Sequence, residues 1–230
     1  MTGSAPVGRP VGRHVLLAGA TGLVGGEILR GLLADDTVAS VHVLARRALQ
    51  IQHPKLQAQV VDFAALPPLP ALDEAYLALG TTIKVAGSQA AFRAVDVDAN
   101  LAVARAALAA GARRLGLVSA MGADPQSRVF YNRVKGELEE AVKGLGFEAL
   151  VIARPSLLLG DRGALGQPVR MGEHAGSLLA GLLRPLIPAR YRPIRASAVA
   201  RALLAHVPRA GAELVLSSDA MQAASAQRGD

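Results

Sequence analysis

Apolar positions along this chain follow two periods, and the alternation of these periods predicts its secondary structure. Short apolar runs are typical of buried strands, whereas apolar residues that recur every three or four positions are typical of helices. Residues 15–18 form such a run, and Ile28, Leu29, Leu32 and Leu33 follow it at helical spacing. We therefore expect a buried strand, a glycine-containing turn and a helix near the start of the chain.

The same two patterns continue along the rest of the chain. We expect further strands at residues 38–45, 60–63, 74–79, 114–119, 149–153 and 213–216. We expect helices at residues 89–110, from a cap at Ser127 toward Gly144, and from a cap at Ser197 to His206. The inner face of the 89–110 helix would carry Phe92, Val95, Leu101, Ala104 and Leu108. Residues 1–12 and 218–230 lack periodicity, so we expect a flexible leader and a frayed tail.

Strands that alternate with helices predict an α/β fold, because crossovers between parallel strands must pass over the sheet. We expect a doubly wound, mostly parallel Rossmann sheet of about seven strands with helices on both faces. Residues 13–217 then form a single domain, in which segment 156–195 is irregular and rich in glycine and proline. Such sheets bind ligands beyond the carboxyl ends of their strands.

Composition narrows the classes of function. The chain has no cysteine, which excludes disulfides and thiolate metal sites, and its five histidines are scattered, so we expect no metal. The net charge of +7 is spread along the chain, and aromatic residues make up only 3%, too few for a base-stacking surface. We therefore expect no nucleic-acid partner. The apolar stretch 177–188 is interrupted and too short to span a bilayer, so we also expect no membrane partner. The absence of cysteine fits a reducing compartment, and we expect a cytoplasmic location.

Three glycines at three-residue spacing, Gly19, Gly22 and Gly25, separate the first strand from the first helix. A helix N-terminus offers free N–H groups and a positive dipole end, and missing side chains let a pyrophosphate approach. A tight turn between buried elements is the alternative interpretation. The strand, turn and helix together favour a dinucleotide site. Its expected cofactor contacts are Gly19, Thr21, Gly22, Leu23, Val24 and Gly25.

Arg46 and Arg47 follow the second strand, where a dinucleotide fold meets the adenosine ribose. A carboxylate at this place would accept a hydrogen bond from the 2′-hydroxyl of NAD, whereas arginine favours a 2′-phosphate. We therefore expect NADP(H) rather than NAD(H). The alternative is that both are ordinary surface arginines.

Further strand ends bring polar groups to the same rim of the sheet. Asp62 and Phe63 are candidates to receive the adenine, although Asp62 could equally cap a loop. Gly80, Thr81 and Thr82 follow the fourth strand, and Ser119 ends the fifth. Because these residues come from separate strands, their convergence tests the fold as well as the function.

Tyr131 and Lys135 lie four positions apart on a predicted helix, so their side chains share one face. A nearby ammonium favours the phenolate, the form that a general base needs, and Ser119 could hold a carbonyl or alcohol oxygen beside the phenol. In the alternative interpretation, Tyr131 packs its ring and Lys135 pairs with Glu139. The upstream glycine loop favours the catalytic interpretation.

With these motifs the chain resembles a short-chain dehydrogenase/reductase. It is most similar to the atypical, epimerase-like members, in particular the small oxidoreductases related to human Tat-interacting protein. The resemblance covers roughly residues 13–217. It rests on the glycine loop with Ser119 and Tyr131-x-x-x-Lys135, and on the segments 45–47, 61–63, 79–82, 122–124, 134–137, 154–155 and 161–162.

The resemblance implies NADPH binding and, in catalytic members, hydride transfer to or from a carbonyl or secondary alcohol. Tyr131 would be the proton donor, and Lys135 would bind the nicotinamide ribose and tune Tyr131. Ser119 would orient the substrate oxygen, and Asn100 would support the proton relay or lie on the helix surface. Arg154 and Pro155 would join the cofactor site, and segment 156–195 would cover the substrate.

Two classes of function remain open from the sequence. The first is an NADPH-dependent oxidoreductase that acts on a small carbonyl or alcohol substrate. The second is a non-catalytic NADPH-binding protein with a redox-sensing or regulatory role. No feature of the sequence decides between a monomer and a homodimer.

Overall fold

A seven-stranded parallel sheet forms the centre of the molecule in this computed structural model, which describes residues 11–159 and 188–226. Its strands are β1 (Arg13–Ala18), β2 (Val38–Ala45), β3 (Leu56–Val60), β4 (Glu74–Leu77), β5 (Arg114–Val118), β6 (Ala149–Arg154) and β9 (Glu213–Ser217). The strand order is β3-β2-β1-β4-β5-β6-β9, and every pairing is parallel. The predicted doubly wound Rossmann fold is therefore confirmed.

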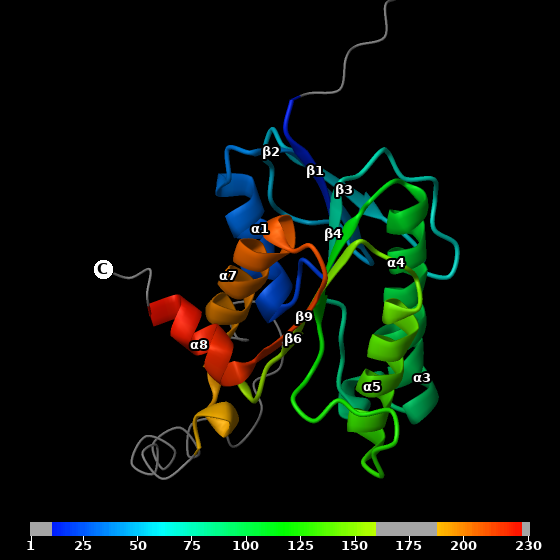
Figure 1. Cartoon of the computed structure of the whole chain (residues 1–230). Helices are drawn as coiled ribbons and strands as arrows, with labels where there is room; N and C mark the ends of the chain where they lie inside the picture. Colours follow the sequence, from blue (N-terminus) through cyan, green and yellow to red (C-terminus); the bar gives the residue numbers. More distant parts are fainter. Residues whose placement is uncertain (1–10, 160–187, 227–230) are drawn as a thin grey trace, which may run out of the picture.

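Helices cover both faces of this sheet (Figure 1). One face carries α1 (Leu23–Ala34), α7 (Ala196–His206) and α8 (Ser218–Ala226). The other carries α3 (Gln89–Arg93), a π-helix (Ala94–Ala99), α4 (Asn100–Ala109) and α5 (Phe130–Lys143). The shorter elements are α2 (Ile83–Ala86), the paired strands β7 (Leu158–Leu159) and β8 (Ile194–Arg195), and 3-10 turns at Ala189–Tyr191 and Val207–Arg209.

Alternate residues of β1 explain why both faces of the sheet need helices. Val15 and Leu17 join the core beneath α1 and α7, whereas Leu16 and Ala18 join the core beneath α4 and α5. Successive side chains of a strand point to opposite faces, so a strand that is apolar throughout must be covered on both. None of the helices in the described parts of the chain is long and apolar enough to cross a membrane.

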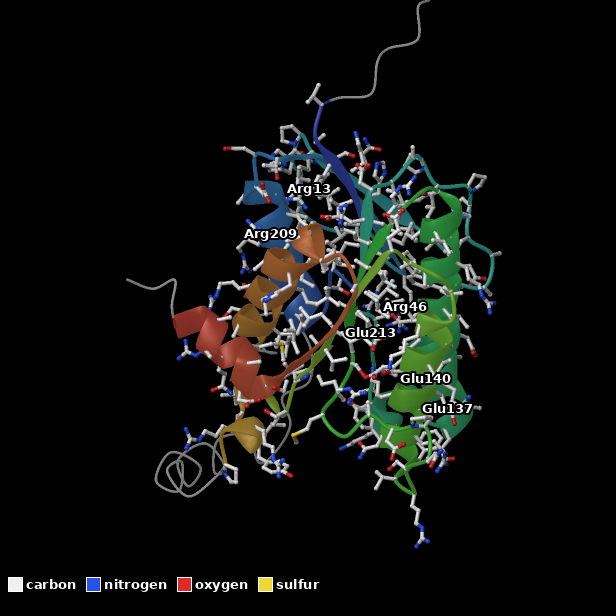
Figure 2. The ribbon with its side chains drawn as sticks, viewed as in Figure 1. Arg13, Arg46, Glu137, Glu140, Arg209 and Glu213 are labelled. Atoms are coloured by element: carbon white, nitrogen blue, oxygen red, sulfur yellow. The ribbon has the colours of Figure 1, made fainter. Side chains whose placement is uncertain are left out.

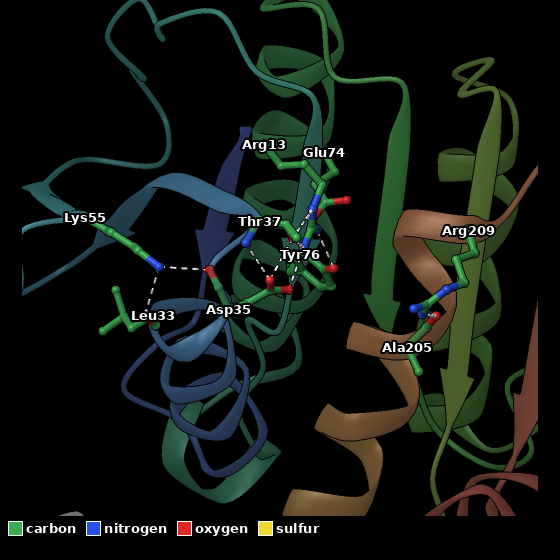
Figure 3. A network of polar contacts seen from close by, with 9 residues as sticks. All are labelled: Arg13, Leu33, Asp35, Thr37, Lys55, Glu74, Tyr76, Ala205 and Arg209. Carbon is green, nitrogen blue, oxygen red and sulfur yellow. Dashed lines mark hydrogen bonds and ion pairs between the residues drawn. The ribbon is translucent and has the colours of Figure 1, made fainter. Parts of the chain in front are cut away.

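A buried ion-pair network lies at the amino ends of β1 and β4. In Figure 2, Arg13 of this network lies toward the upper end of the view, as does Arg209, whereas Glu137 and Glu140 of α5 lie lower. The guanidinium of Arg13 pairs with Glu74, which is 1% exposed, and with Asp35 at 2.6 Å. The Tyr76 hydroxyl donates to Glu74 at 3.3 Å (Figure 3). This network joins two strands to the end of α1.

Burial and ion pairing shift the pKa of Glu74 in opposite directions. Burial raises the pKa of the Glu74 carboxyl, and the Arg13 guanidinium opposes that rise. Burial also raises the pKa of Tyr76, well above its ordinary value, so the phenol stays neutral and remains a donor. Arg13 is therefore the counter-charge that lets Glu74 lie inside the fold.

Several sequence predictions at the ends of elements are wrong. The third strand covers Leu56–Val60 instead of residues 60–63, because its edge position exposes most of its side chains and hides the apolar pattern. The chain from Ser218 is not frayed: residues 218–226 form α8, whose Met221 is fully buried. Ser127 and Ser197 are not helix caps, since α5 begins after Val129 and α7 after Arg195.

Two further predicted segments are only partly described. Residues 1–10 of the predicted leader lie outside the described residues, as do residues 160–187 of segment 156–195 and residues 227–230 of the tail. The described ends of segment 156–195 are ordered against each other: β7 pairs with β8 in parallel, and Ser156 Oγ donates to the Arg192 carbonyl at 2.5 Å.

Candidate functional site

The glycine loop between β1 and α1 approaches its neighbours more closely than any side chain would allow. Gly19 has φ +95°, and a Cβ added there would lie 2.3 Å from the Ala78 carbonyl oxygen after β4. A Cβ at Gly25 would lie 2.0 Å from the Gly19 carbonyl oxygen, so α1 can begin at Leu23 only with glycine at this position. Gly22 is the N-cap and has no side chain to cap the helix.

This loop therefore presents an uncovered helix N-terminus at the carboxyl end of β1. The first N–H groups of a helix have no partner within it, and the dipole favours an anion there. Thr21 is exposed, Leu23 is half-buried, and Val24 is buried beneath the loop. A glycine turn into a helix N-terminus that no side chain caps fits a pyrophosphate, which is the group that the sequence predicts.

The residues predicted to meet the adenosine end lie at the adjacent strand ends. Arg46 and Arg47 are exposed and directly follow β2, next to β1 in the sheet (Figure 2). Asp62 is exposed and Phe63 half-buried, two and three residues after β3. The Asp62 carboxylate accepts from the Ala64 N–H at 2.9 Å, so the loop-cap role left open by the sequence is present.

The exit from β4 lies against a buried ion pair. Lys135 Nζ is 2.7 Å from Asp96 Oδ1, and the two residues are 4% and 1% exposed. The second oxygen of Asp96 accepts from the Thr81 N–H at 2.9 Å. A Cβ added at Gly80 would lie 3.6 Å from Asp96 Oδ1 and 4.0 Å from Lys135 Nζ. The lysine that the sequence singled out is thus at the predicted rim.

Thr82 and Asn100 hold the backbone around this pair. The Thr82 hydroxyl accepts from the Val85 N–H at 3.2 Å and caps α2. Asn100 is completely buried, which contradicts the helix-surface alternative. Its amide donates to the carbonyl of Asp96 at 3.1 Å and to those of Leu79 and Val95 at 3.3 Å. Asn100 therefore ties the end of β4 to the π-helix.

Tyr131 lies in the first turn of α5 and is 37% exposed, four residues before Lys135. Its ring packs against that of Phe92, with centroids 5.8 Å apart. Tyr131 therefore combines ring packing with partial exposure to solvent. The alternative pairing of Lys135 with Glu139 is not found, because Lys135 pairs with Asp96.

Glu139 instead pairs with two residues predicted to belong to the site. Its carboxylate, 1% exposed, accepts hydrogen bonds from the Ser119 hydroxyl and from Arg154, whose Nε is 3.1 Å from Oε1 and whose terminal nitrogen is 2.5 Å from Oε2. These bonds raise the pKa of the Arg154 guanidinium above its ordinary range. The carbonyl of the buried Pro155 accepts from the Met121 N–H at 2.8 Å, which joins the exits of β5 and β6.

Sequence reasoning missed Asp96, and it named Glu139 only as an alternative partner of Lys135 and not as a member of the site. Glu139 lies four residues after Lys135 and eight after Tyr131, so helical spacing alone could have placed it on the same face. Asp96 lies four residues before Asn100, but in a π-helix, whose extra residue per turn changes the buried face. Among the described residues, no group of three or more His, Asp or Glu could hold a metal ion.

Comparison with known protein families supports a dinucleotide-binding site. Residues 19–161 match a family model described as NAD(P)H-binding. The chain is 37% identical over 182 residues to "Protein fmp52, mitochondrial" of Emericella nidulans, a match that covers 74% of this chain and 76% of the relative.

Solved structures show the same fold at low sequence identity. A short-chain dehydrogenase/reductase family oxidoreductase from Burkholderia thailandensis has a TM-score of 0.65 and 20% identity, covering 95% of this chain and 97% of the other. MoeE5 in complex with UDP-glucose and NAD has a TM-score of 0.64 and 18% identity, covering 94% and 82%.

The expected cytoplasmic location is wrong on this comparison. The Emericella nidulans relative and further fungal relatives at similar identity are all named as mitochondrial proteins. Composition could not reveal this, because the absence of cysteine fits any reducing compartment.

Proposed function

The chain belongs to the NAD(P)H-binding family, and from this premise we propose that it is an NADP(H)-dependent oxidoreductase of the short-chain dehydrogenase/reductase type. It would transfer hydride between the cofactor and a small carbonyl or secondary alcohol. The observation that carries the proposal is the position of Lys135. Its ammonium lies against Gly80 on the rim that holds the glycine loop, one helical turn from Tyr131.

The glycine loop and Arg46 support the choice of cofactor. The loop at Gly19, Gly22 and Gly25 would hold the pyrophosphate against the start of α1. Arg46 and Arg47 would meet a 2′-phosphate at the end of β2, where no carboxylate competes. When bound there, NADPH would supply the hydride for the carbonyl carbon.

The chain's own residues would manage the proton and the orientation. The Tyr131 hydroxyl would give its proton to the substrate oxygen as that oxygen gains charge, or take it back in the oxidising direction. The Lys135 ammonium would bind the nicotinamide ribose and favour the phenolate that remains. Ser119, at the end of β5, would orient the substrate oxygen, and Arg154 with Pro155 would close the cofactor site beside β6.

A panel of aldehydes and ketones tests this proposal. Wild-type protein is expected to oxidise NADPH with at least one member, and Tyr131→Phe should lose about 10²–10⁴-fold of that turnover, the usual contribution of a positioned acid. NADPH affinity, measured by fluorescence titration, should stay unchanged in the variant. NADPH binding without turnover across the panel would favour the non-catalytic alternative, and full turnover by Tyr131→Phe would refute the role of Tyr131.

A further inference from the structure

Asp96 is a buried carboxylate with two different partners, one for each oxygen. Oδ1 lies 2.7 Å from the Lys135 ammonium, and Oδ2 accepts from the Thr81 N–H at 2.9 Å. Lys135 comes from α5 and Thr81 from the loop after β4, so one side chain joins two separate walls of the candidate site. Asp96 itself lies behind Gly80 and is 1% exposed.

The energetics of this pair indicate a role other than stability. Burying two charges costs desolvation free energy that can exceed the gain from their Coulombic attraction. A buried ion pair is therefore weak evidence for stabilisation. An apolar pair of similar volume would hold α5 against the π-helix equally well. A carboxylate, by contrast, fixes the direction of an ammonium and of a backbone N–H at the same time.

The local helix geometry presents Asp96 to both partners. Asp96 lies in the π-helix Ala94–Ala99, and such turns are frequent at functional sites because they shift the side-chain register. Asn100 fixes this turn through its bonds to the carbonyls of Asp96 and Leu79. Asp98, two residues along, is exposed and takes no part in the pair.

We propose that Asp96 is a positioning residue for the cofactor site: it holds the Lys135 ammonium and the Thr81 backbone in the geometry that binds NADPH. This inference rests on the proposed function. Lys135 Nζ forms an ion pair with Asp96 Oδ1 at 2.7 Å, and the N–H donors of the ammonium would serve the nicotinamide ribose and the Tyr131 phenol. Asp96 therefore acts on cofactor affinity through Lys135 and Thr81, without touching the cofactor.

Titration of wild type, Asp96→Asn and Asp98→Asn with NADPH tests the inference. Asp96→Asn keeps an oxygen for the Thr81 N–H but gives up the charge. Its dissociation constant should rise at least about tenfold, a loss typical when the partner that orients a binding group is removed. Asp98→Asn should bind like wild type.

A purely structural role gives a different result. Asp96→Asn would then unfold at a lower temperature but, once folded, bind NADPH with the affinity of wild type, and that result overturns the inference. If Asp96→Asn does not fold, Asp96→Glu replaces it, because it keeps the charge and displaces it by one methylene. Weaker binding by folded Asp96→Glu supports the inference, and wild-type affinity overturns it.

The wild-type titration separates this inference from the proposed function. A wild type that binds neither NADPH nor NADH overturns both. Saturable binding by wild type with an unchanged Asp96→Asn titration overturns the role of Asp96 alone.

Discussion

Ser119 donates its hydroxyl hydrogen to Glu139, a carboxylate that also accepts hydrogen bonds from Arg154 on both of its oxygens. The Ser119 oxygen therefore keeps its lone pairs for whatever approaches from the rim. An oxygen in this state accepts a hydrogen bond from an alcohol but cannot donate one to a carbonyl. The site as it stands suits an alcohol oxygen at Ser119, and a carbonyl oxygen would depend on Tyr131 for its donor.

Glu139→Gln should change this arrangement while keeping the volume of the side chain. A glutamine amide can donate to the Ser119 oxygen and no longer neutralises Arg154, so Ser119 loses its fixed orientation. We expect turnover on any substrate found to fall by about tenfold or more, since such small misplacements are costly. The matched control is Glu140→Gln, an exposed neighbour. Equal turnover in both variants would show that Glu139 does not act on Ser119.

Gly25→Ala tests whether the glycine loop binds the cofactor. Its new methyl group would lie 2.0 Å from the Gly19 carbonyl oxygen, which the loop cannot accept without moving. We expect loss of NADPH binding in a titration and a lower melting temperature.

Gly26→Ala is the control for the loop variant. A methyl group there would lie 3.4 Å from the Ala20 carbonyl oxygen, an ordinary contact, and alanine favours the helix by up to about 1 kcal/mol over glycine. NADPH affinity in this variant should equal that of wild type. If Gly25→Ala bound NADPH equally well, the pyrophosphate would not lie at this loop.

Arg13→Met should destabilise the fold without changing the rim. Glu74, which is only 1% exposed, would remain buried without its counter-charge. Breaking a buried pair in this way lowers the free energy of unfolding by about 3–5 kcal/mol. Urea unfolding measures the loss. Arg113→Met breaks the exposed pair with Glu148 and should cost less than about 1 kcal/mol. Similar losses in both variants would contradict the special role of Arg13.

His42 should make the fold sensitive to mild acid. Burial, and then the neighbouring His14, lower the pKa of His42 below its ordinary value of 6.5. A lowered pKa in the folded state means that the unfolded chain takes up the proton first, so stability is lost as the pH falls below 6.5.

The measurement for His42 is the melting temperature at neutral and mildly acidic pH. On acidification, the melting temperature of wild type should fall more than that of His42→Gln. The glutamine amide can keep the contact with Ser40 but does not titrate. A His42→Gln curve parallel to that of wild type would show that His42 is not the sensitive group.

The sheet could be predicted from the sequence because its signals are local. The apolar run in β1, the spacing of Ile28 and Leu32 in α1 and the glycines between them each act within a few residues. The carboxyl ends of parallel strands meet at one edge, so the strand pattern alone places Gly19, Gly80 and Ser119 on one rim.

Contacts between distant segments could not be predicted in this way. The pair of Arg13 and Glu74 joins residues 61 positions apart, and no periodicity links them. In the 89–110 helix the π-helix buries Asp96 and Asn100 and leaves the predicted inner residues Val95 and Leu101 half-buried. Helix α8 was missed because its small residues carry little signal until Met221 packs into the core beside α7.

Titration of wild type and Arg46→Ser with NADPH and with NADH tests the central claim most directly. Arg105→Ser, an exposed arginine on α4, is the control. We expect wild type and Arg105→Ser to bind NADPH more tightly than NADH, and Arg46→Ser to lose about tenfold of its NADPH affinity, the value of one charge-assisted contact of about 1.5 kcal/mol, with NADH unchanged. Failure of wild type to bind either dinucleotide, or tighter binding of NADH, would contradict the account.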